Sequence, residues 1–294
     1  MTDTVVAERT ETDRARLGLP RRRRPPLWWE AIAVVWLLWI YDSITNLAPA
    51  RATAALNHAE SVLRLEALIP VNLERALNRW ISSHHLIAVV VADYYDNAHF
   101  VVTLGVLAWL WIGRPDEYRR WRTVLVLINV IGFSVFLVYP MAPPRMLPGF
   151  VDTVAISHAI GSWHSGGLAA SADQFAAMPS LHLAWAFWSA QAVWSTTRSR
   201  PIRVTAMLYP PVTLFAVIAT ANHFVIDSLA GVATAALAER MGPVLASLCG
   251  PVAGTLRNIR GQLEPKGRPV GGEPNDFRLS DDSQPERPKP PDYP

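Results

Sequence analysis

Apolar residues in this chain fall into long blocks separated by shorter polar connections. An α-helix needs about 20 predominantly apolar residues to cross the hydrocarbon core of a bilayer. Six blocks approach or exceed this length, and the fourth is the shortest: 27–47, 86–112, 124–141, 181–194, 204–221 and 224–248. The pattern predicts an all-α fold, a polytopic membrane bundle of about six transmembrane helices.

Polar segments flank these blocks and divide the chain into three regions. Residues 1–26 mix acids with arginines and hold no apolar core, so we predict no cleavable signal peptide and expect the first helix to remain as an anchor. Residues 250–294 are rich in proline, glycine and charge, a composition that cannot bury enough apolar surface to offset chain entropy. We therefore expect a membrane domain at 27–249 between two disordered tails.

Basic residues indicate the orientation, because Lys and Arg favour the cytoplasmic side of short loops. Four arginines at 21–24 place the N-terminus inside the cell. With six crossings, the basic clusters at 113–122, 198–203 and 257–268 fall on the same side. We expect a multi-pass protein of the plasma membrane with both tails in the cytoplasm.

The same threading places the connections 48–85 and 142–180 outside the cell, together with the turn at Asn222. The arginines at 21–24 are interpreted as a solvated topology signal with some affinity for anionic lipid, so we expect membrane lipids and no nucleic acid as partners. Cys249 is the single cysteine of the chain, which excludes an intrachain disulfide. The oligomeric state does not follow from the sequence.

Two short segments at the outer ends of these blocks carry the candidate chemistry. His223 and Asp227 are four residues apart, a spacing that on a helix puts both side chains on one face. The carboxylate can accept a hydrogen bond from one imidazole nitrogen, which leaves the other free to attack phosphorus. His182 opens the fourth helix on the same side and can protonate the leaving alkoxide, then take a proton from the acceptor. These residues predict catalysis through a phosphohistidine.

Phosphate groups also need hydrogen-bond donors. The first backbone N–H groups of the fourth helix are unpaired and attract an anion, and Ser180 adds a hydroxyl there. Arg145 follows two prolines just outside the third helix, and its planar guanidinium can bind phosphate oxygens. We predict that Arg145 and Ser180 bind phosphate.

A third group of polar residues lies on the second helix and in the outer connections. Asp96 and His99 share a helix face, and with Asn222 they are candidates for binding a hydroxyl-rich head group or an acceptor. The alternative is a buried network that locks the helices together. Glu66 and Glu74 lie in the first outer connection, where the leucine pattern predicts a helix on the membrane surface.

Each candidate has a structural alternative. The pair of His223 and Asp227 can be a purely structural hydrogen bond, and Arg145 can extend to lipid headgroups. A metal site built from His182, His223 and Asp227 lacks a further ligand at characteristic spacing. We therefore expect no metal and no cofactor.

The segments Pro179-Ser180-Leu181-His182 and His223-x-x-x-Asp227 resemble the second and third signature blocks of the type 2 phosphatidic acid phosphatase (PAP2) superfamily. The resemblance implies a PAP2-like helical core, with His223 as nucleophile, Asp227 as its orienting partner and His182 as general acid. The similarity spans roughly Ala54 to Leu237.

Departures from the family pattern point to one branch. The usual first-block lysine is missing, since the first lysine is Lys266, and Ala216-Val217 stands where Ser-Arg is usual. Leu181 and the segment 139–145 resemble instead the inositol phosphorylceramide synthase-like group, which are inositolphosphotransferases. Arg145 is the candidate to replace part of the missing basic cage.

The resemblance implies transfer of a phosphorylated, phosphoinositol-like head group from a phospholipid to an alcohol acceptor at the extracytoplasmic face. Two alternatives stay open. Water as acceptor would make the protein a lipid or polyprenyl phosphate phosphatase, because the same three residues serve both reactions. A non-enzymatic membrane transporter or lipid-binding protein would use Asp96 and His99 as a relay.

Overall fold

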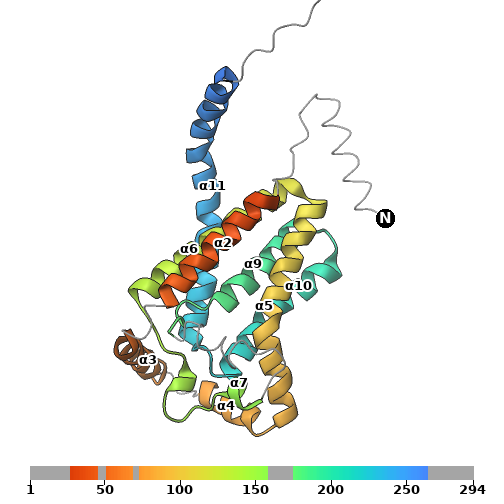
Figure 1. The fold of residues 1–294 in the computed structure, drawn as a ribbon. Coiled ribbons are helices and arrows are strands. Elements are labelled where there is room, and N and C mark those ends of the chain that lie inside the picture. The colour runs from red at the N-terminus through yellow and green to blue at the C-terminus, as the bar shows by residue number, and fades with distance from the viewer. Residues whose placement is uncertain (1–26, 46–50, 69–72, 158–174, 264–294) are drawn as a thin grey trace, which may run out of the picture. The chain divides into compact units, whose positions relative to one another are not determined.

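The computed structural model describes residues 27–45, 51–68, 73–157 and 175–263, and these form helices and no strand (Figure 1). The all-α fold predicted from the sequence is thereby confirmed. The predicted tail at 1–26, and the part of the predicted C-terminal tail beyond residue 263, lie outside the described residues. The chain divides into two compact units, Met1–Ser247 and Leu248–Pro294.

Six long helices coincide with the six apolar blocks of the sequence. They are α2 (Leu27–Thr45), α5 (His85–Gly113), α6 (Pro115–Val138), α9 (Leu181–Thr196), α10 (Arg200–Ala219) and α11 (Val225–Leu263). The second compact unit begins within α11, which continues past the end predicted for the membrane domain. The basic cluster after residue 113 was expected in a loop, but most of it lies on the first turns of α6, because Pro115 starts a helix well.

In the described parts of the two connections predicted to lie outside the cell, the structure has four short helices. They are α3 (Ala52–Glu66), α4 (Leu73–Ser82), the 3-10 helix η2 (Pro144–Met146) and α7 (Thr153–Ser157). The helix expected in the first connection is therefore present as α3. Its buried face packs against protein, since Ala55, Ala59 and Val62 share a core cluster with Met141 and Phe224.

Two of the described helices, α6 and α10, are long and apolar enough to cross a membrane. The predicted number of about six spans is not confirmed. The 16 residues of α9 extend for about 24 Å, which is less than the ~30 Å of a hydrocarbon core. Large apolar side chains are nevertheless exposed on several long helices, for example Val35, Trp39, Val101 and Leu208. Such extensive exposed apolar surface is typical of proteins that contact lipid.

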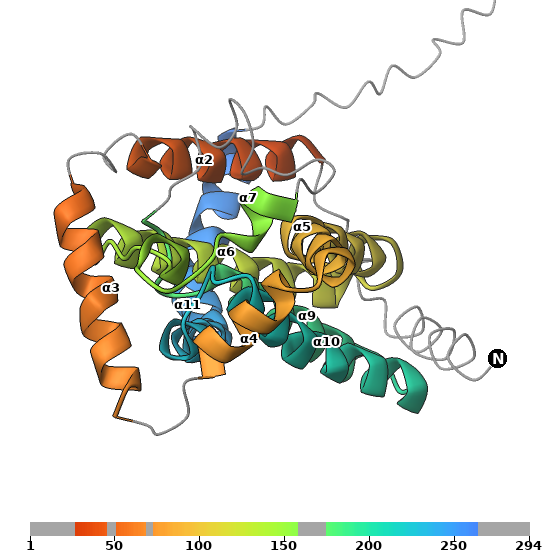
Figure 2. The ribbon, with the colours of Figure 1, turned by 90° about the horizontal axis from the view of Figure 1, so that it is seen from below.

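Helix α9 contacts α5, α6 and α10, and the colours of Figures 1 and 2 allow this arrangement to be followed from two sides. Near the middle of α9, Trp188 is buried and donates a hydrogen bond from Nε1 to the carbonyl of Trp121 on α6, at 2.9 Å. Ala184 and Ala192 share the cluster with Ala235 of α11. Small side chains let helix backbones approach closely, so α9 and α11 can lie side by side.

The connection between α6 and α9 is held in place by backbone hydrogen bonds. The amide of Met141 donates to the carbonyl of Phe175 at 2.8 Å, and the amide of Ala177 donates to the carbonyl of Met141 at 3.1 Å. The amide of Ala142 donates to Ala55 of α3 at 3.1 Å. These contacts fasten the segment that precedes η2 both to α3 and to the residues just before α9.

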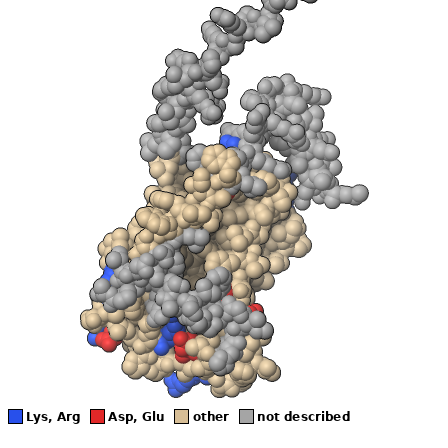
Figure 3. Space-filling view, in the orientation of Figure 1, with Lys and Arg blue, Asp and Glu red and all other residues tan. Residues whose placement is uncertain are grey.

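Charged side chains are unevenly distributed over the face shown in Figure 3. Most of the coloured charged atoms gather near its lower end, over α3 and α4, and the described surface in the middle of the view is almost free of them. This separation agrees with an apolar band that faces hydrocarbon and a polar end that faces water.

Candidate active site

The site forms where the N-terminal ends of α9 and α11 meet. The amide of Ser180 donates a hydrogen bond to the carbonyl of Asp227 at 3.0 Å. One turn later on α11, a Cβ atom added to Gly231 would lie 2.2 Å from the carbonyl oxygen of Ser180. Only glycine tolerates so close a backbone approach. Gly231 therefore allows the two segments that carry the candidate catalytic residues to touch.

His223 lies in the turn that precedes α11, two residues before the helix begins. The turn follows Ala221, which has a left-handed φ of 57°, and the amide of His223 donates to the carbonyl of Val217 at 3.2 Å. The assumption that His223 and Asp227 share a helix is thus wrong in detail. The two side chains still meet, because Asp227 Oδ2 accepts the amide of Phe224 at 3.0 Å and so closes the first turn of α11.

The protonation of the His223 ring follows from its partners. Nδ1 lies 3.3 Å from Asp227 Oδ1 and 3.1 Å from the carbonyl oxygen of Ala177. Both partners are acceptors here, so Nδ1 must carry the proton. In the neutral ring Nε2 then presents its lone pair. The buried Asp227 carboxylate also accepts the hydroxyl of Ser228 at 3.4 Å, which helps to hold it in place.

The lone pair of His223 points at the second histidine. His223 Nε2 lies 3.3 Å from His182 Nδ1, and the two rings meet edge to face with centroids 5.4 Å apart. Since Nε2 of His223 is the acceptor, Nδ1 of His182 is the donor. The structure thus joins the three predicted catalytic residues in one chain of contacts, from Asp227 through His223 to His182.

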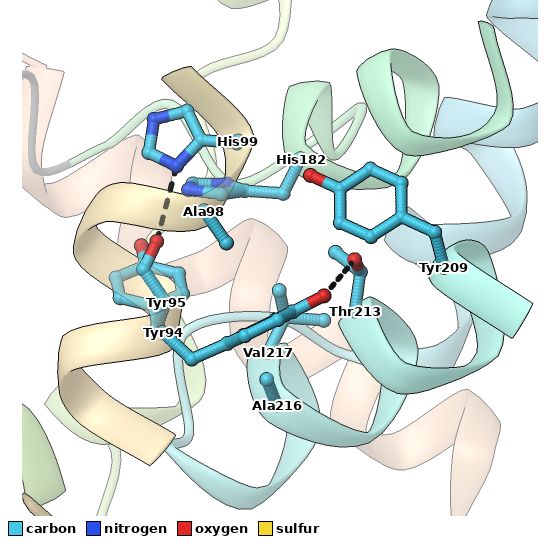
Figure 4. Close-up of a pocket in the computed structure, with 9 residues that line it drawn as sticks. All are labelled: Tyr94, Tyr95, Ala98, His99, His182, Tyr209, Thr213, Ala216 and Val217. Atoms are coloured by element: carbon cyan, nitrogen blue, oxygen red, sulfur yellow. Dashed lines mark hydrogen bonds between the residues drawn. The ribbon is translucent and has the colours of Figure 1, made fainter. Parts of the chain in front are cut away.

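A pocket of aromatic and hydroxyl side chains adjoins His182 (Figure 4). It lies between α5, α9 and α10. The His182 ring stacks on the Tyr95 ring with centroids 4.5 Å apart, and it meets the His99 ring edge to face with centroids 4.4 Å apart. The remaining lining residues are Tyr94, Ala98, Tyr209, Thr213, Ala216 and Val217. His99, predicted from the sequence, is therefore brought to the site.

Two hydroxyl groups of this pocket belong to α10 and were missed in the sequence. The Tyr94 hydroxyl and Thr213 Oγ1 are 2.9 Å apart. The Tyr209 hydroxyl is buried, has no hydrogen-bond partner among the described residues, and points toward His182 (Figure 4). Tyr209 and Thr213 are four residues apart on an apolar helix, and this spacing could have indicated in the sequence that their hydroxyl groups share one helix face.

Arg145 contacts the turn that carries His223. Its backbone amide donates to the carbonyl of Ala221 at 2.8 Å, and its guanidinium Nη1 donates to Asn222 Oδ1. The Nε atom lies 3.4 Å from Asp152 Oδ2, and the side chain is only 11% exposed. The amide nitrogen of Asn222 also donates to Thr220 Oγ1 at 2.9 Å. Phosphate binding by Arg145 and head-group binding by Asn222 stay predictions.

Ser180 and Asp96 have structural surroundings of their own. The fully buried Ser180 is the N-cap of α9, and its Oγ accepts the amide of Leu183 at 3.4 Å. A capping hydroxyl keeps its own hydrogen for another acceptor. Asp96 is buried on α5 but does not line the pocket beside His182. Their binding roles therefore remain predictions.

Glu66 at the end of α3 contacts the start of α11. Its Oε1 accepts the amide of Ile226 at 2.8 Å, one of the N–H groups that a helix leaves unpaired at its beginning. The pKa of Glu66 is raised to about 8, chiefly by burial and also by the neighbouring carboxyl groups of Glu74 and Asp227, while the Ile226 hydrogen bond acts in the opposite direction. The connection 48–85 thus supports the start of α11 beside the candidate catalytic residues, a role that the sequence did not reveal.

Metal binding can be examined among the described residues. Within these ranges no group of three or more His, Cys, Asp or Glu side chains is arranged to hold a metal ion. The residues His182, His223 and Asp227 form instead a linear series of hydrogen-bonding neighbours.

Comparison with known proteins gives one family. Residues 60–240, more than half of the chain, match the PAP2 superfamily, close to the range over which the resemblance was found in the sequence. No curated protein and no solved structure gave a match. Members of this superfamily are phosphatases or phosphotransferases that act on lipid phosphates, so the protein is an enzyme of this type. The chain belongs to the PAP2 superfamily.

Proposed function

We propose that this protein is an integral membrane lipid phosphotransferase. It moves a phosphorylated, phosphoinositol-like head group from a phospholipid to an alcohol acceptor. The observation that carries the proposal is the pairing of His223 Nε2 with His182 Nδ1 at 3.3 Å, on a ring whose other nitrogen is held by Ala177 and Asp227. This arrangement supplies a nucleophile and a proton donor to one phosphorus atom.

In the first step Nε2 of His223 attacks the phosphorus of the donor lipid. The bond between phosphorus and the diacylglycerol oxygen breaks as the N–P bond forms. His182 enters this step protonated on both ring nitrogens and gives the proton on Nδ1 to the departing alkoxide, so that diacylglycerol leaves as a neutral alcohol and His182 becomes a neutral imidazole. The negative charge of Asp227 stabilises the positive charge that the His223 ring acquires.

In the second step the acceptor alcohol attacks the phosphohistidine. His182, now without its Nδ1 proton, takes the proton of the attacking hydroxyl. The N–P bond breaks, and its electron pair returns to Nε2 of His223. The proton count on both histidines is then the same as before the first step, so the cycle closes.

Charge on the phosphoryl oxygens is balanced by groups beside the triad. We assign this role to the Arg145 guanidinium, which is held by Asn222 next to His223, and to the N-terminus of α9. Ser180 donates its hydroxyl hydrogen to the same oxygens. Arg145 thereby compensates for part of the basic cage that this chain lacks.

The choice of an alcohol over water is supported by the surroundings of His182. Aromatic rings of Tyr95 and His99 lie against it, and the Tyr209 hydroxyl points toward it. These groups reduce the room for free water and offer hydrogen bonds to a hydroxyl compound. The inositol phosphorylceramide synthase-like pattern around Leu181 and in residues 139–145 favours the same outcome.

We place the site on the extracytoplasmic side of the plasma membrane, in a multi-pass protein with both tails in the cytoplasm. The support is the distribution of basic residues, since the connection 142–180 that precedes His182 holds one arginine, whereas the shorter segments 113–122 and 198–203 hold four and three.

The test uses purified protein in vesicles that contain phosphatidylinositol labelled in its inositol ring and a lipid alcohol such as ceramide, or a diacylglycerol whose acyl chains differ from those of the donor. We expect a new labelled lipid by mass analysis, and an acid-labile labelled protein when the reaction is quenched early. Release of inositol phosphate alone, with no new lipid, would show a hydrolase. Movement of an unaltered lipid across the bilayer would show a transporter.

A further inference from the structure

A groove runs between α2 and α6 on the outer surface of the bundle. Its volume is about 370 Å³. Its walls are formed by Trp36, Trp39, Ile40, Ser43 and Ile44 of α2 and by Val130, Phe133, Ser134 and Leu137 of α6. None of these residues belongs to the catalytic site described above.

The two serines in the walls of this groove offer no free hydrogen-bond donor, because their hydroxyl groups are bonded within their own helices. Ser43 Oγ donates to the carbonyl of Trp39 at 2.8 Å, and Ser134 Oγ donates to the carbonyl of Val130 at 2.7 Å. A hydroxyl that bonds back to its own helix presents no unsatisfied donor to a ligand. Trp36 and Trp39 are 52% and 65% exposed, so aromatic surface is open to whatever fills the groove. The lining fits a hydrocarbon chain.

The floor of the groove continues to the catalytic segments. Ile44 and Phe133 belong to a buried cluster that also contacts Leu181 and Ala176. Leu181 directly precedes His182, and it packs so closely on α6 that a Cβ atom at Gly132 would lie 2.7 Å from its Cδ2. A chain lying in the groove is therefore separated from the catalytic segment by one layer of side chains.

A positive charge stands at one end of the groove. The guanidinium of Arg51 donates a hydrogen bond to the carbonyl of Leu137, the last groove residue on α6. One helical turn further along α3, Ala55 accepts the amide of Ala142 in the segment that leads to Arg145. An apolar groove with a cation at its rim is complementary to an anionic phospholipid.

We propose that this groove holds one hydrocarbon chain of the donor phospholipid, with the polar end of that lipid toward the Arg51 rim. The occupant is the enzyme's own donor, so the proposal rests on the proposed function. In this proposal the groove determines selectivity for acyl-chain length, and the site beside His182 determines selectivity for the head group.

Photolabelling tests the proposal without turnover. Phosphatidylinositol with a diazirine on one acyl chain, and diacylglycerol with the same chain, are each placed at trace level in phosphatidylcholine vesicles with the full-length protein. We expect the phosphatidylinositol probe to label peptides that contain Trp36 or Phe133 several-fold more than the diacylglycerol probe does. Equal labelling by the two probes would show ordinary bilayer lipid and would overturn the proposal.

Variants sharpen this result. Ser134→Phe fills the groove, and we expect it to lower groove labelling by the phosphatidylinositol probe about tenfold, the effect of a few methylene groups losing contact. Ser43→Phe does the same from the opposite wall and serves if Ser134→Phe does not fold. Val35→Phe adds the same ring at an exposed position of α2 outside the groove and should leave labelling unchanged. Unchanged labelling in a folded Ser134→Phe or Ser43→Phe protein contradicts the proposal.

Activity measurements separate this proposal from the proposed function. If the unaltered protein makes no new lipid, the proposed function fails, and the labelling still decides whether the groove binds donor. If new lipid is made, Ser134→Phe should raise KM for a long-chain donor about tenfold and leave KM for a short-chain, water-soluble donor unchanged. An equal effect on both donors would show general damage to the site and would count against the groove.

Discussion

Nε2 of His223 and Nδ1 of His182 lie 3.3 Å apart, although 41 residues separate them in the chain. The contact depends on the backbone hydrogen bond from Ser180 to Asp227, which joins the beginnings of α9 and α11. One histidine is fixed as an acceptor by Ala177 and Asp227, so the other is fixed as a donor. The two rings therefore have different roles, and their variants should behave differently.

Replacing the two histidines separates nucleophile from acid. His223→Ala should abolish the phosphohistidine with every donor, because no nitrogen is left to bind phosphorus. His182→Ala should slow release of diacylglycerol by about 10²–10⁴, the usual worth of a general acid. A donor with p-nitrophenol as its leaving group needs no proton, so His182→Ala should form the phosphohistidine from it at near the normal rate in a quenched-flow measurement. Equal losses with both donors would contradict the acid role of His182.

Gly231→Ala should disrupt the contact between α9 and α11. The new Cβ atom would lie 2.2 Å from the Ser180 carbonyl oxygen, so one backbone must move. We expect a destabilisation of about 1–3 kcal/mol and a loss of turnover of at least tenfold. Gly105→Ala is the matched control, since nothing lies within 4 Å of the added atom there. Thermal unfolding and kcat measured on both variants decide the matter, and equal behaviour would refute the role of Gly231.

Tyr209→Phe should change the fate of the phosphohistidine. The hydroxyl is buried without a partner among the described residues, so its removal should leave stability unchanged or raise it by about 1 kcal/mol. If it holds the acceptor, the ratio of lipid transfer to hydrolysis should fall about fivefold, while the phosphohistidine forms at the normal rate. An unchanged product ratio would show that Tyr209 does not contact the acceptor.

Glu66 should make stability depend on pH. Its pKa is raised from 4.5 to about 8 by burial, so the folded protein binds a proton between these values that the unfolded chain does not. The stabilising contribution is complete below about pH 4.5 and is lost as pH rises toward 8. Glu66→Gln keeps an acceptor for the Ile226 amide and should flatten this dependence in thermal unfolding between pH 5 and 9. Glu60→Gln, at an exposed position of the same helix, should keep the normal slope.

Arg145→Lys tests whether the guanidinium binds phosphate. Lysine keeps the charge but loses the planar fork and cannot contact Asn222 and Asp152 in the same way. We expect KM for an anionic donor to rise about tenfold, equivalent to one lost charge-assisted hydrogen bond. If KM is unchanged and only the unfolding temperature falls, Arg145 is a structural residue of the turn.

Much of the fold could be predicted from the sequence, because helices in hydrocarbon require long uninterrupted apolar blocks. All six blocks became long helices in the described part of the chain, with ends within a few residues in most cases. The three candidate catalytic residues could also be selected from the sequence, since His223 and Asp227 are close in sequence and His182 lies in a recognisable segment, and the structure brings them together. Local spacing carried this information.

The partners of the triad were not predictable in the same way. Tyr95 and Tyr209 adjoin His182 from two different helices, and Glu66 reaches the start of α11 across 160 residues of sequence. No local period encodes which faces of two helices meet. That choice depends on side-chain packing and on single positions such as Gly231, where a methyl group would keep the backbones apart.

The sequence by itself thus determined an all-α membrane-type chain, its superfamily and three candidate catalytic residues, because hydropathy and short-range spacing are local properties. Only the tertiary structure decided which nitrogen of His223 is the acceptor, which hydroxyl groups surround His182 and which carboxyl group supports α11. Those features depend on distances of about 3 Å between atoms far apart in the chain, and such distances are set by packing.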